Sequence, residues 1–289
     1  MSLRPIDTGA VPLSGPRVAL ALGGGAARGI GHIPVLEALD ELGVTPVAIA
    51  GTSIGAILGA CYAAGLTGRE IREHCLALFG DTRIEPFRRI YSARSLKTLI
   101  SPRTSAMFDG VTLFEILLPE AVRRDFSALK IPFCAIATDF YAIEQVILDH
   151  GPIIPAITAS SALPGVFRPV VIGEQVLIDG GFVNPTPYDV VQRGADITIA
   201  IDVTGATVRG PGRPVPSSID AWIGAAQITL HSITREKLRS VQPDILLRPA
   251  VGPYGAFDFY KIREILEISA PIKEELKRAL GAKLDALGK

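Results

Sequence analysis

A serine flanked by glycines stands where a strand is expected to turn into a helix. The stretch Gly51-Thr52-Ser53-Ile54-Gly55 follows an apolar run at 46–50 and precedes a small-residue helical run at 56–64. This spacing is typical of a nucleophile elbow, in which glycines permit a strained turn that exposes the serine hydroxyl. We therefore predict that Ser53 is a nucleophile, against the alternative that it only caps a helix.

A nucleophilic serine needs a base to accept its proton, and Asp179 is the best candidate. It ends the apolar run at 176–178 and is followed by Gly180 and Gly181, which permit a tight turn. The one histidine after it, His231, lies in a continuous helical pattern and lacks the loop signals expected of a catalytic histidine. A carboxylate that contacts Ser53 directly is favoured, although Asp-Gly-Gly is also compatible with an ordinary turn.

A glycine-rich loop follows the first expected strand and is the predicted oxyanion hole. Its sequence is Gly23-Gly24-Gly25-Ala26-Ala27-Arg28-Gly29, and it leads directly into a helix. Such loops present backbone N–H groups to an anion at the positive end of the helix. We expect Gly24, Gly25 and Ala26 to hold the oxyanion together with the N–H of Ile54. Gly23, Arg28, Gly29, Gly51, Gly55, Gly180 and Gly181 are expected to support the site, with Arg28 orienting the loop or binding an anionic head group.

A dinucleotide-binding loop is the alternative interpretation of these glycines. It requires an acidic residue about 20 positions later, at the end of the next strand. Here that strand ends in Gly51-Thr52-Ser53, whereas Asp40 and Glu41 precede it in a helical pattern. The spacing disfavours a dinucleotide.

Alternating strand-like and helical runs must position these residues. Strands are predicted at 17–22, 46–50, 131–138, 170–178, 196–203 and 244–247. Helices are predicted at 29–42, 54–64, 68–79, 113–118, 153–162, 187–193, 218–240 and 258–287, the last one started, kinked or broken by Pro271. Such alternation favours an α/β fold with a mainly parallel sheet covered on both faces.

Charge, hydropathy and cysteine content argue against several classes of protein. The 289 residues carry 29 basic and 29 acidic side chains, so no overall charge attracts nucleic acid. No apolar run reaches the roughly 18 residues of a membrane span, but a mean hydropathy of +0.36 suggests exposed apolar surface. Three dispersed cysteines and four histidines show no metal-ligand spacing, so we expect buried thiols, no metal, no cofactor and a cytoplasmic location. Residues 1–16 lack a signal core and are expected to be flexible.

One basic stretch interrupts this pattern. Residues 83–103 contain six lysines and arginines and one acidic residue, interleaved with apolar side chains. A stretch of this kind suits peripheral contact with a membrane surface or an anionic ligand, and equally a solvated helix face.

Together, these motifs resemble those of patatin-like phospholipases, especially the bacterial branch related to the neuropathy target esterase catalytic domain. The glycine-rich loop, Gly-x-Ser-x-Gly, the segment 159–169 (ASSALPGVFRP) and Asp-Gly-Gly occur in the family's order between about Val18 and Gln192. One departure is Ala26: when the family's usual Gly-x-Gly-x-x-Gly loop is aligned to end on Gly29, Ala26 stands at its third position, where the loop has its second glycine. Ser160 and Ser161 are expected to be structural.

The resemblance implies a three-layer α/β/α fold and a Ser53–Asp179 dyad. It further implies metal-free hydrolysis of phospholipids, lysophospholipids or other fatty acyl esters through an acyl-enzyme. We expect a catalytic core at 18–192, and a part at 193–289 that completes the same domain with terminal helices. Two alternatives stay open: an acyltransferase that uses the same acyl-enzyme, and a non-catalytic member of the fold that binds lipid or protein.

Overall fold

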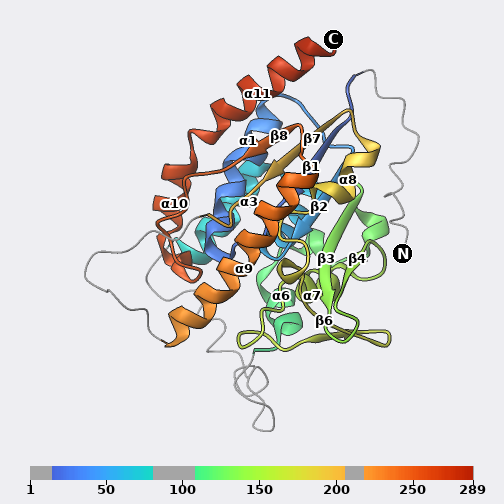
Figure 1. Ribbon diagram of the computed structural model, residues 1–289, viewed down its shortest axis with the longest axis vertical. Coiled ribbons are helices and arrows are strands. Elements are labelled where there is room, and N and C mark those ends of the chain that lie inside the picture. Colours follow the sequence, from blue (N-terminus) through green and yellow to red (C-terminus); the bar gives the residue numbers. More distant parts are fainter. Residues whose placement is uncertain (1–14, 81–107, 206–217, 289) are drawn as a thin grey trace.

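The computed structural model describes residues 15–80, 108–205 and 218–288. An eight-stranded mixed sheet lies between helices on both faces (Figure 1), which confirms the expected α/β/α layers. The strand order is β5-β6-β3-β2-β1-β7-β8, and β4 pairs with β3. The basic stretch at 83–103 lies outside the described residues.

Parallel pairing joins five of the strands and antiparallel pairing joins the rest. The parallel part comprises β1 (Val18–Leu22), β2 (Ala48–Thr52), β3 (Phe133–Asp139), β7 (Ile197–Ile201) and β8 (Ile245–Leu247). The antiparallel part adds β4 (Glu144–Leu148), β5 (Val170–Ile172) and β6 (Gln175–Asp179).

The layers follow from the alternation of side chains along β1. Val18, Leu20 and Leu22 face one hydrophobic cluster, whereas Ala19 and Ala21 face the other. Successive strand residues point to opposite faces, so the sequence Val-Ala-Leu-Ala-Leu gives one bulky face and one small-residue face. The bulky face packs against most of the helices, and the alanine face permits close approach of the others.

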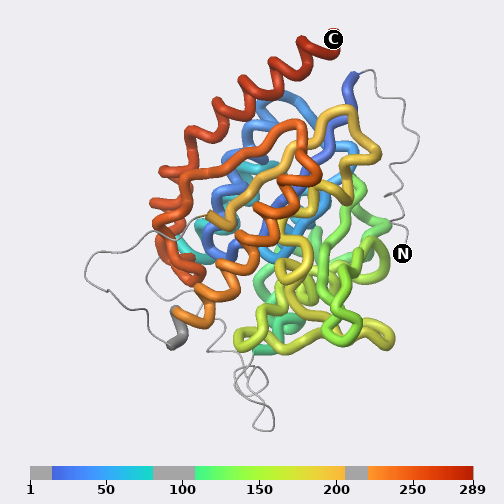
Figure 2. The backbone as a smooth tube through the Cα atoms, viewed as in Figure 1, coloured from blue at the N-terminus to red at the C-terminus, as the bar shows by residue number. Residues whose placement is uncertain are grey.

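Helices on the bulky face form the larger layer. They are α1 (Ile33–Glu41), α2 (Ile54–Ala63), α3 (Gly68–Phe79), α6 (Gly110–Leu117), α7 (Ile153–Ser160), α10 (Ile262–Ser269) and α11 (Ile272–Ala286). The alanine face carries α8 (Tyr188–Val191) and the end of α9 (Ser218–Ser240). Figure 2 shows that α1, near the start of the chain, and α11, near its end, lie side by side. No helix among the described residues is long and apolar enough to cross a bilayer.

Several expected elements differ from those observed. The single strand predicted at 170–178 is a hairpin, because Gly173 adopts a left-handed turn with φ of +61°. The half-exposed strand β4 was not predicted. The predicted helix 29–42 begins as a 3-10 turn at Ala26–His32, and the predicted helix 258–287 becomes a 3-10 turn at Asp258–Lys261 followed by α10 and α11. Pro271 caps the start of α11.

The pairings of β3 explain how the two key segments meet. Strand β4 pairs with residues 135–139 of β3 and so occupies one edge of that strand. Strands β2 and β6 must therefore share the other edge, where Thr52 pairs with Ile136 and Asp179 pairs with Ala137. The carboxyl ends of β2 and β6 thus meet end to end against consecutive residues of β3.

Candidate active site

Ser53 occupies the strained turn between β2 and α2. Its φ of +55° and ψ of −123° are rare for a residue with a Cβ atom, and such strain costs of order 1–3 kcal/mol. The turn is held by the backbone N–H of Ser53, which donates to Ser160 Oγ at 2.9 Å. The side chain is half-buried, and its Oγ donates to Asp179 Oδ2 at 2.7 Å.

Glycines let the turn fit between its neighbours. A Cβ atom on Gly55 would lie 2.1 Å from the Leu22 carbonyl oxygen, and one on Gly51 would lie 2.5 Å from the Gly55 carbonyl oxygen. Likewise, a Cβ atom on Gly180 would lie 2.0 Å from the Ile136 carbonyl oxygen. A side chain at these positions would distort the Ser53 turn itself, push it away from β1, or push the Asp179 segment away from β3.

Asp179 is buried, with 4% of its surface exposed. Its Oδ1 accepts the Gly181 N–H at 2.8 Å, while its Oδ2 accepts the Ser53 hydroxyl. Burial raises the pKa of Asp179 to about 6, and the two hydrogen bonds oppose that rise. A carboxylate with a raised pKa is a stronger base than an exposed aspartate.

The glycine-rich loop presents only some of the expected donors. The N–H of Gly24 donates to the Pro185 carbonyl at 2.9 Å, so it is not free to bind an ester oxygen. In contrast, the N–H groups of Gly25, Ala26 and Ile54 have no acceptor among the described residues. Ala26 stands at φ +51°, so it keeps the left-handed backbone that favours glycine despite its Cβ atom.

Arg28 supports this loop but does not face the pocket. Its side chain is buried and donates to the backbone carbonyls of Tyr254 at 2.7 Å, Thr204 at 2.5 Å and Gly252 at 3.5 Å. The expectation that Arg28 binds an anionic head group is therefore wrong, because its donors are committed inside the protein. Its role as a loop-orienting residue agrees with these contacts.

Sequence reasoning missed His32 as a second support of the loop. Its Nε2 lies 2.8 Å from the Gly23 carbonyl oxygen. Burial lowers the pKa of His32 to about 4, so at neutral pH the ring is uncharged and donates to that carbonyl. The only signal in the sequence was a histidine three residues after Gly29, the last residue of the glycine-rich loop.

A buried polar network behind Ser53 was also missed. Thr52 Oγ1 donates to the Asn184 carbonyl at 2.8 Å, and Lys237 Nζ donates to Asn184 Oδ1 at 2.7 Å. Lys237 also pairs with Asp189 and lies 4.1 Å from the centre of the Tyr188 ring. This network ties α9 to the residue that precedes the nucleophile.

An apolar cavity of about 420 Å³ opens beside Ser53 and Asp179. Its wall comes from α2, α3, α6, α9 and the segments around Phe167 and Phe257. Its few polar side chains include His74, Ser161 and Gln227, and most of the remainder are aliphatic or aromatic. A cavity of this size and character suits one hydrocarbon chain.

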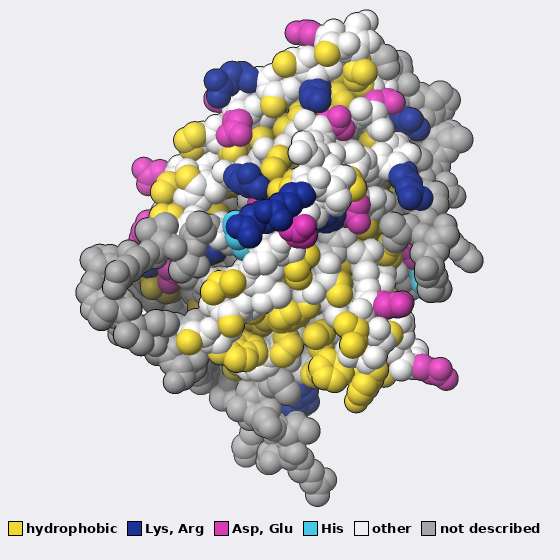
Figure 3. All heavy atoms as spheres, in the orientation of Figure 1, with side chains coloured by type: hydrophobic (Ala, Val, Ile, Leu, Met, Phe, Trp, Pro, Cys, Tyr) yellow, Lys and Arg dark blue, Asp and Glu magenta, His cyan; other side chains and the backbone are white. Residues whose placement is uncertain are grey.

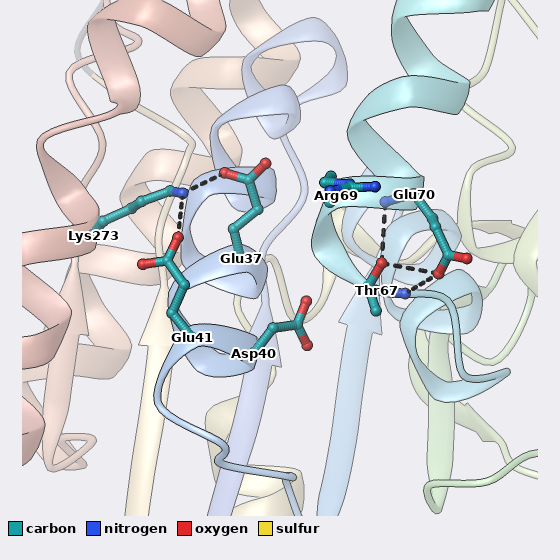
Figure 4. A pocket seen from close by; sticks show the side chains of 7 residues that line it. All are labelled: Glu37, Asp40, Glu41, Thr67, Arg69, Glu70 and Lys273. Carbon is teal, nitrogen blue, oxygen red and sulfur yellow. Dashed lines mark hydrogen bonds and ion pairs between the residues drawn. The ribbon is translucent and has the colours of Figure 1, made fainter.

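A second hollow, about 560 Å³, lies between α1, α3 and α11 and is lined by charged groups (Figure 4). Lys273 pairs there with Glu37 and Glu41, while Thr67 and Glu70 form a capping box. Asp40 accepts the Gly68 N–H at 2.6 Å and the Tyr62 hydroxyl at 2.8 Å. Its carboxylates serve helix packing, so Ser53 and Asp179 mark the better candidate site. Within the described ranges no group of three or more His, Cys, Asp or Glu side chains is arranged to hold a metal ion.

This chain is similar to known proteins over most of its length. A family model described as patatin-like phospholipase matches residues 20–191. An uncharacterized NTE family protein of Mycobacterium tuberculosis is 37% identical over 220 residues, covering 73% of this chain and 55% of that protein. Patatin-like phospholipase domain-containing protein 7 of Rattus norvegicus is 34% identical over 280 residues, covering 89% of this chain and 20% of that protein.

More distant matches extend the comparison. Lysophospholipase NTE1 of Candida glabrata is 28% identical over 297 residues, covering 93% of this chain and 16% of that protein. The crystal structure of VipD from Legionella pneumophila overlaps 91% of this chain and 67% of that chain, with a TM-score of 0.48 and 12% identity. The chain spans about half the length of its mycobacterial relatives.

Proposed function

Because this chain belongs to the patatin-like phospholipase family, we propose that it is a serine lipid acyl hydrolase with Ser53 and Asp179 as a catalytic dyad. The observation that carries the proposal is the 2.7 Å hydrogen bond from Ser53 Oγ to the buried Asp179 carboxylate, made at the edge of an apolar cavity. The apolar cavity can hold a fatty acyl chain, and the adjacent dyad can attack the ester bond that joins this chain to its alcohol.

The first half-reaction forms an acyl-enzyme. Ser53 Oγ attacks the ester carbonyl carbon while its proton passes to Asp179 Oδ2. The N–H groups of Gly25, Ala26 and Ile54 stabilise the negative charge that develops on the carbonyl oxygen. The bond to the alcohol oxygen then breaks, and Asp179 returns the proton to that leaving oxygen.

The second half-reaction releases the fatty acid. A water molecule gives a proton to Asp179 and attacks the acyl-Ser53 carbon, and the same three N–H groups hold the oxyanion. Collapse of this intermediate breaks the bond to Ser53 Oγ, which regains its proton from Asp179. The cavity has room for one acyl chain and does not require a second chain or a particular head group. The proposed substrates therefore include phospholipids, lysophospholipids and simpler acyl esters.

The proposed setting is the cytoplasm. Cys61, Cys75 and Cys134 are free thiols in the structure. Burial raises the pKa of all three thiols, so they are unreactive rather than catalytic. Unpaired cysteines are favoured in a reducing compartment.

Fatty acid release from lysophosphatidylcholine tests the proposal. We expect Ser53→Ala to reduce turnover to background, and Asp179→Asn to reduce it at least about 100-fold because the base is lost. Asp40→Asn is a matched control, since Asp40 also accepts one hydroxyl and one backbone N–H but lies in the remote charged hollow. Retained turnover in folded Asp179→Asn would refute the dyad.

A further inference from the structure

Two adjacent hairpins project beyond Ser53 at the same edge of the sheet. In the register of β3, Asp139 lies three residues past Ile136, the partner of Thr52. At about 3.3 Å per residue, the turn between β3 and β4 therefore begins roughly 10 Å beyond the end of β2. Strands β5 and β6 pair alongside and turn at Gly173, so their tip projects in the same direction.

The tips of these hairpins carry exposed apolar side chains. Ile143 is 80% exposed, Tyr141 77%, Val171 66% and Phe140 54%. Three of these are among the four most exposed large hydrophobic residues of the described chain. We call these four residues the tip cluster; Figure 3 shows hydrophobic side chains gathered in this lower part of the molecule, over the ends of β3 and β6.

The tip cluster is built as a rigid surface. Asp139 Oδ1 accepts the N–H groups of Tyr141 and Ala142, and its Oδ2 accepts Gln175 from the neighbouring hairpin at 2.9 Å. Ile143 stands at φ +58°, a conformation in which a β-branched residue is an outlier. The chain therefore holds a bulky apolar residue where glycine or asparagine would fit with less strain.

Further exposed apolar side chains lie at the rim of the cavity. Phe167 lines the cavity and lies just before β5, which carries Val171. Phe108 and Phe257 also line the cavity, and each exposes about half of its surface or slightly less (42% and 50%). Trp222 of α9 lies against Gly165 at the same rim, since a Cβ atom on that glycine would be 3.1 Å from the indole.

Charge identifies the kind of surface that fits. Residues 139–144 and 170–175 contain Asp139, Glu144 and Glu174 but no lysine or arginine. A strongly anionic membrane would be repelled by these carboxylates, whereas a zwitterionic one would not. Aromatic and aliphatic side chains of this kind partition into the lipid–water interface without needing opposite charge.

We propose that the tip cluster docks this protein on zwitterionic phospholipid surfaces, so that the cavity mouth faces the lipid. The choice of a lipid surface rests on the proposed function, because a hydrolase of bilayer lipids must extract one acyl chain into its cavity. Docking through the tip cluster uses neither Ser53 nor Asp179, so binding is measurable apart from turnover.

The test measures binding to phosphatidylcholine vesicles by sedimentation. The triple variant Phe140→Ser, Tyr141→Ser and Ile143→Ser is expected to bind at least about tenfold more weakly than wild type, equivalent to about 1.4 kcal/mol, because the variant no longer removes these three apolar side chains from water when it docks. A matched control replaces Leu42, Val241 and Leu287, which are exposed apolar residues at the opposite end of the strands, with serine. The control variant is expected to bind as tightly as wild type. Added salt is expected to leave the affinity of both proteins unchanged, because the docking is apolar.

Two further readouts separate the proposals. Ser53→Ala is expected to bind vesicles fully, and the tip triple variant to hydrolyse a soluble short-chain ester at the wild-type rate. Trp222 is the only tryptophan in the chain, and its emission is expected to shift to the blue on vesicles in wild type but not in the tip variant.

Equal binding of the wild type and the tip variant would overturn the docking proposal, as would equal losses in the tip and control variants. A wild-type dimer in light scattering that the tip variant converts to a monomer would assign the tip cluster to a second copy instead. Vesicle binding by a protein that hydrolyses no ester would refute the proposed function while leaving the docking face intact.

Discussion

At Asp179, burial and hydrogen bonding act in opposite directions on the carboxyl, and burial prevails. Its pKa is raised from 3.8 to about 6, although the Gly181 N–H and the Ser53 hydroxyl both favour the charged form. This balance gives a carboxylate that is ionised at neutral pH yet basic enough to accept a proton from serine. The pH dependence of the protein is therefore expected to report on this one side chain.

The hydrolysis rate is expected to fall as the pH drops through about 6, because protonated Asp179 cannot accept the Ser53 proton. Below that value kcat/KM for a soluble ester should decrease roughly tenfold per pH unit. A pH–rate profile checks this directly. A rate that stays constant well below pH 6 would contradict the assignment of Asp179 as the base.

The same pKa shift predicts a stability effect. The folded protein binds the Asp179 proton more tightly than the unfolded chain, so ionisation of this group costs stability as the pH rises from 3.8 to about 6. Asp179→Asn is neutral at every pH and should raise the free energy of unfolding at neutral pH by about 1–3 kcal/mol. Urea unfolding of both proteins measures the difference, which should vanish below pH 3.8.

Among the elements, the β2–α2 turn could be predicted from sequence, because its signals are local. An apolar strand, two glycines and a small-residue helix all lie within one short window around Ser53. Segment 159–169 was matched as a motif, but the contact from Ser160 Oγ to the Ser53 N–H spans 107 residues of sequence. No local pattern encodes a contact of that range.

The hairpins were harder to predict for a different reason. Strand β4 is half-exposed and lacks the continuous apolar run used to recognise strands in a parallel sheet. The break between β5 and β6 depends on Gly173, which sits inside an otherwise unbroken strand-like pattern. The antiparallel part of the sheet, and the tip cluster with it, therefore emerged only from the structure.

Two glycine-to-alanine substitutions should have opposite effects. Gly55→Ala places a Cβ atom 2.1 Å from the Leu22 carbonyl oxygen and should cost several kcal/mol, with loss of turnover. In Gly281→Ala, in the interior of α11, the added Cβ atom meets nothing within 4 Å. This substitution should raise the free energy of unfolding by about 0.5–1 kcal/mol, because alanine loses less backbone entropy than glycine on folding. Thermal unfolding compares the two, and equal effects would show that packing around the Ser53 turn is not tight.

At the scale of the whole molecule, segments from the second half of the described chain pack against the glycine-rich loop and against α1. Arg28 donates to three backbone carbonyls at 204–254, and α11 packs on α1 through the pairs of Lys273 with Glu37 and Glu41. The cavity likewise needs α2, α3, α6 and α9 together. Sequence patterns predicted these helices but not that they line one cavity. Packing between helices that are far apart in the sequence leaves no periodic pattern.

We propose that residues 18–192 and 193–289 fold as one unit joined by Arg28. Arg28→Met should lower the free energy of unfolding by about 2–4 kcal/mol, because buried carbonyls lose their donors. Unfolding should remain a single transition when followed by both fluorescence and circular dichroism. Two separate transitions in the wild type would contradict a common unit.

Labelling with a fluorophosphonate probe, followed by mass mapping of the modified peptide, tests directly whether Asp179 activates Ser53. We expect one equivalent of label on Ser53 in the wild type and in Asp40→Asn, and labelling slowed at least about 100-fold in Asp179→Asn. Label on another residue, or equally fast labelling of folded Asp179→Asn, would contradict a dyad in which Asp179 activates Ser53.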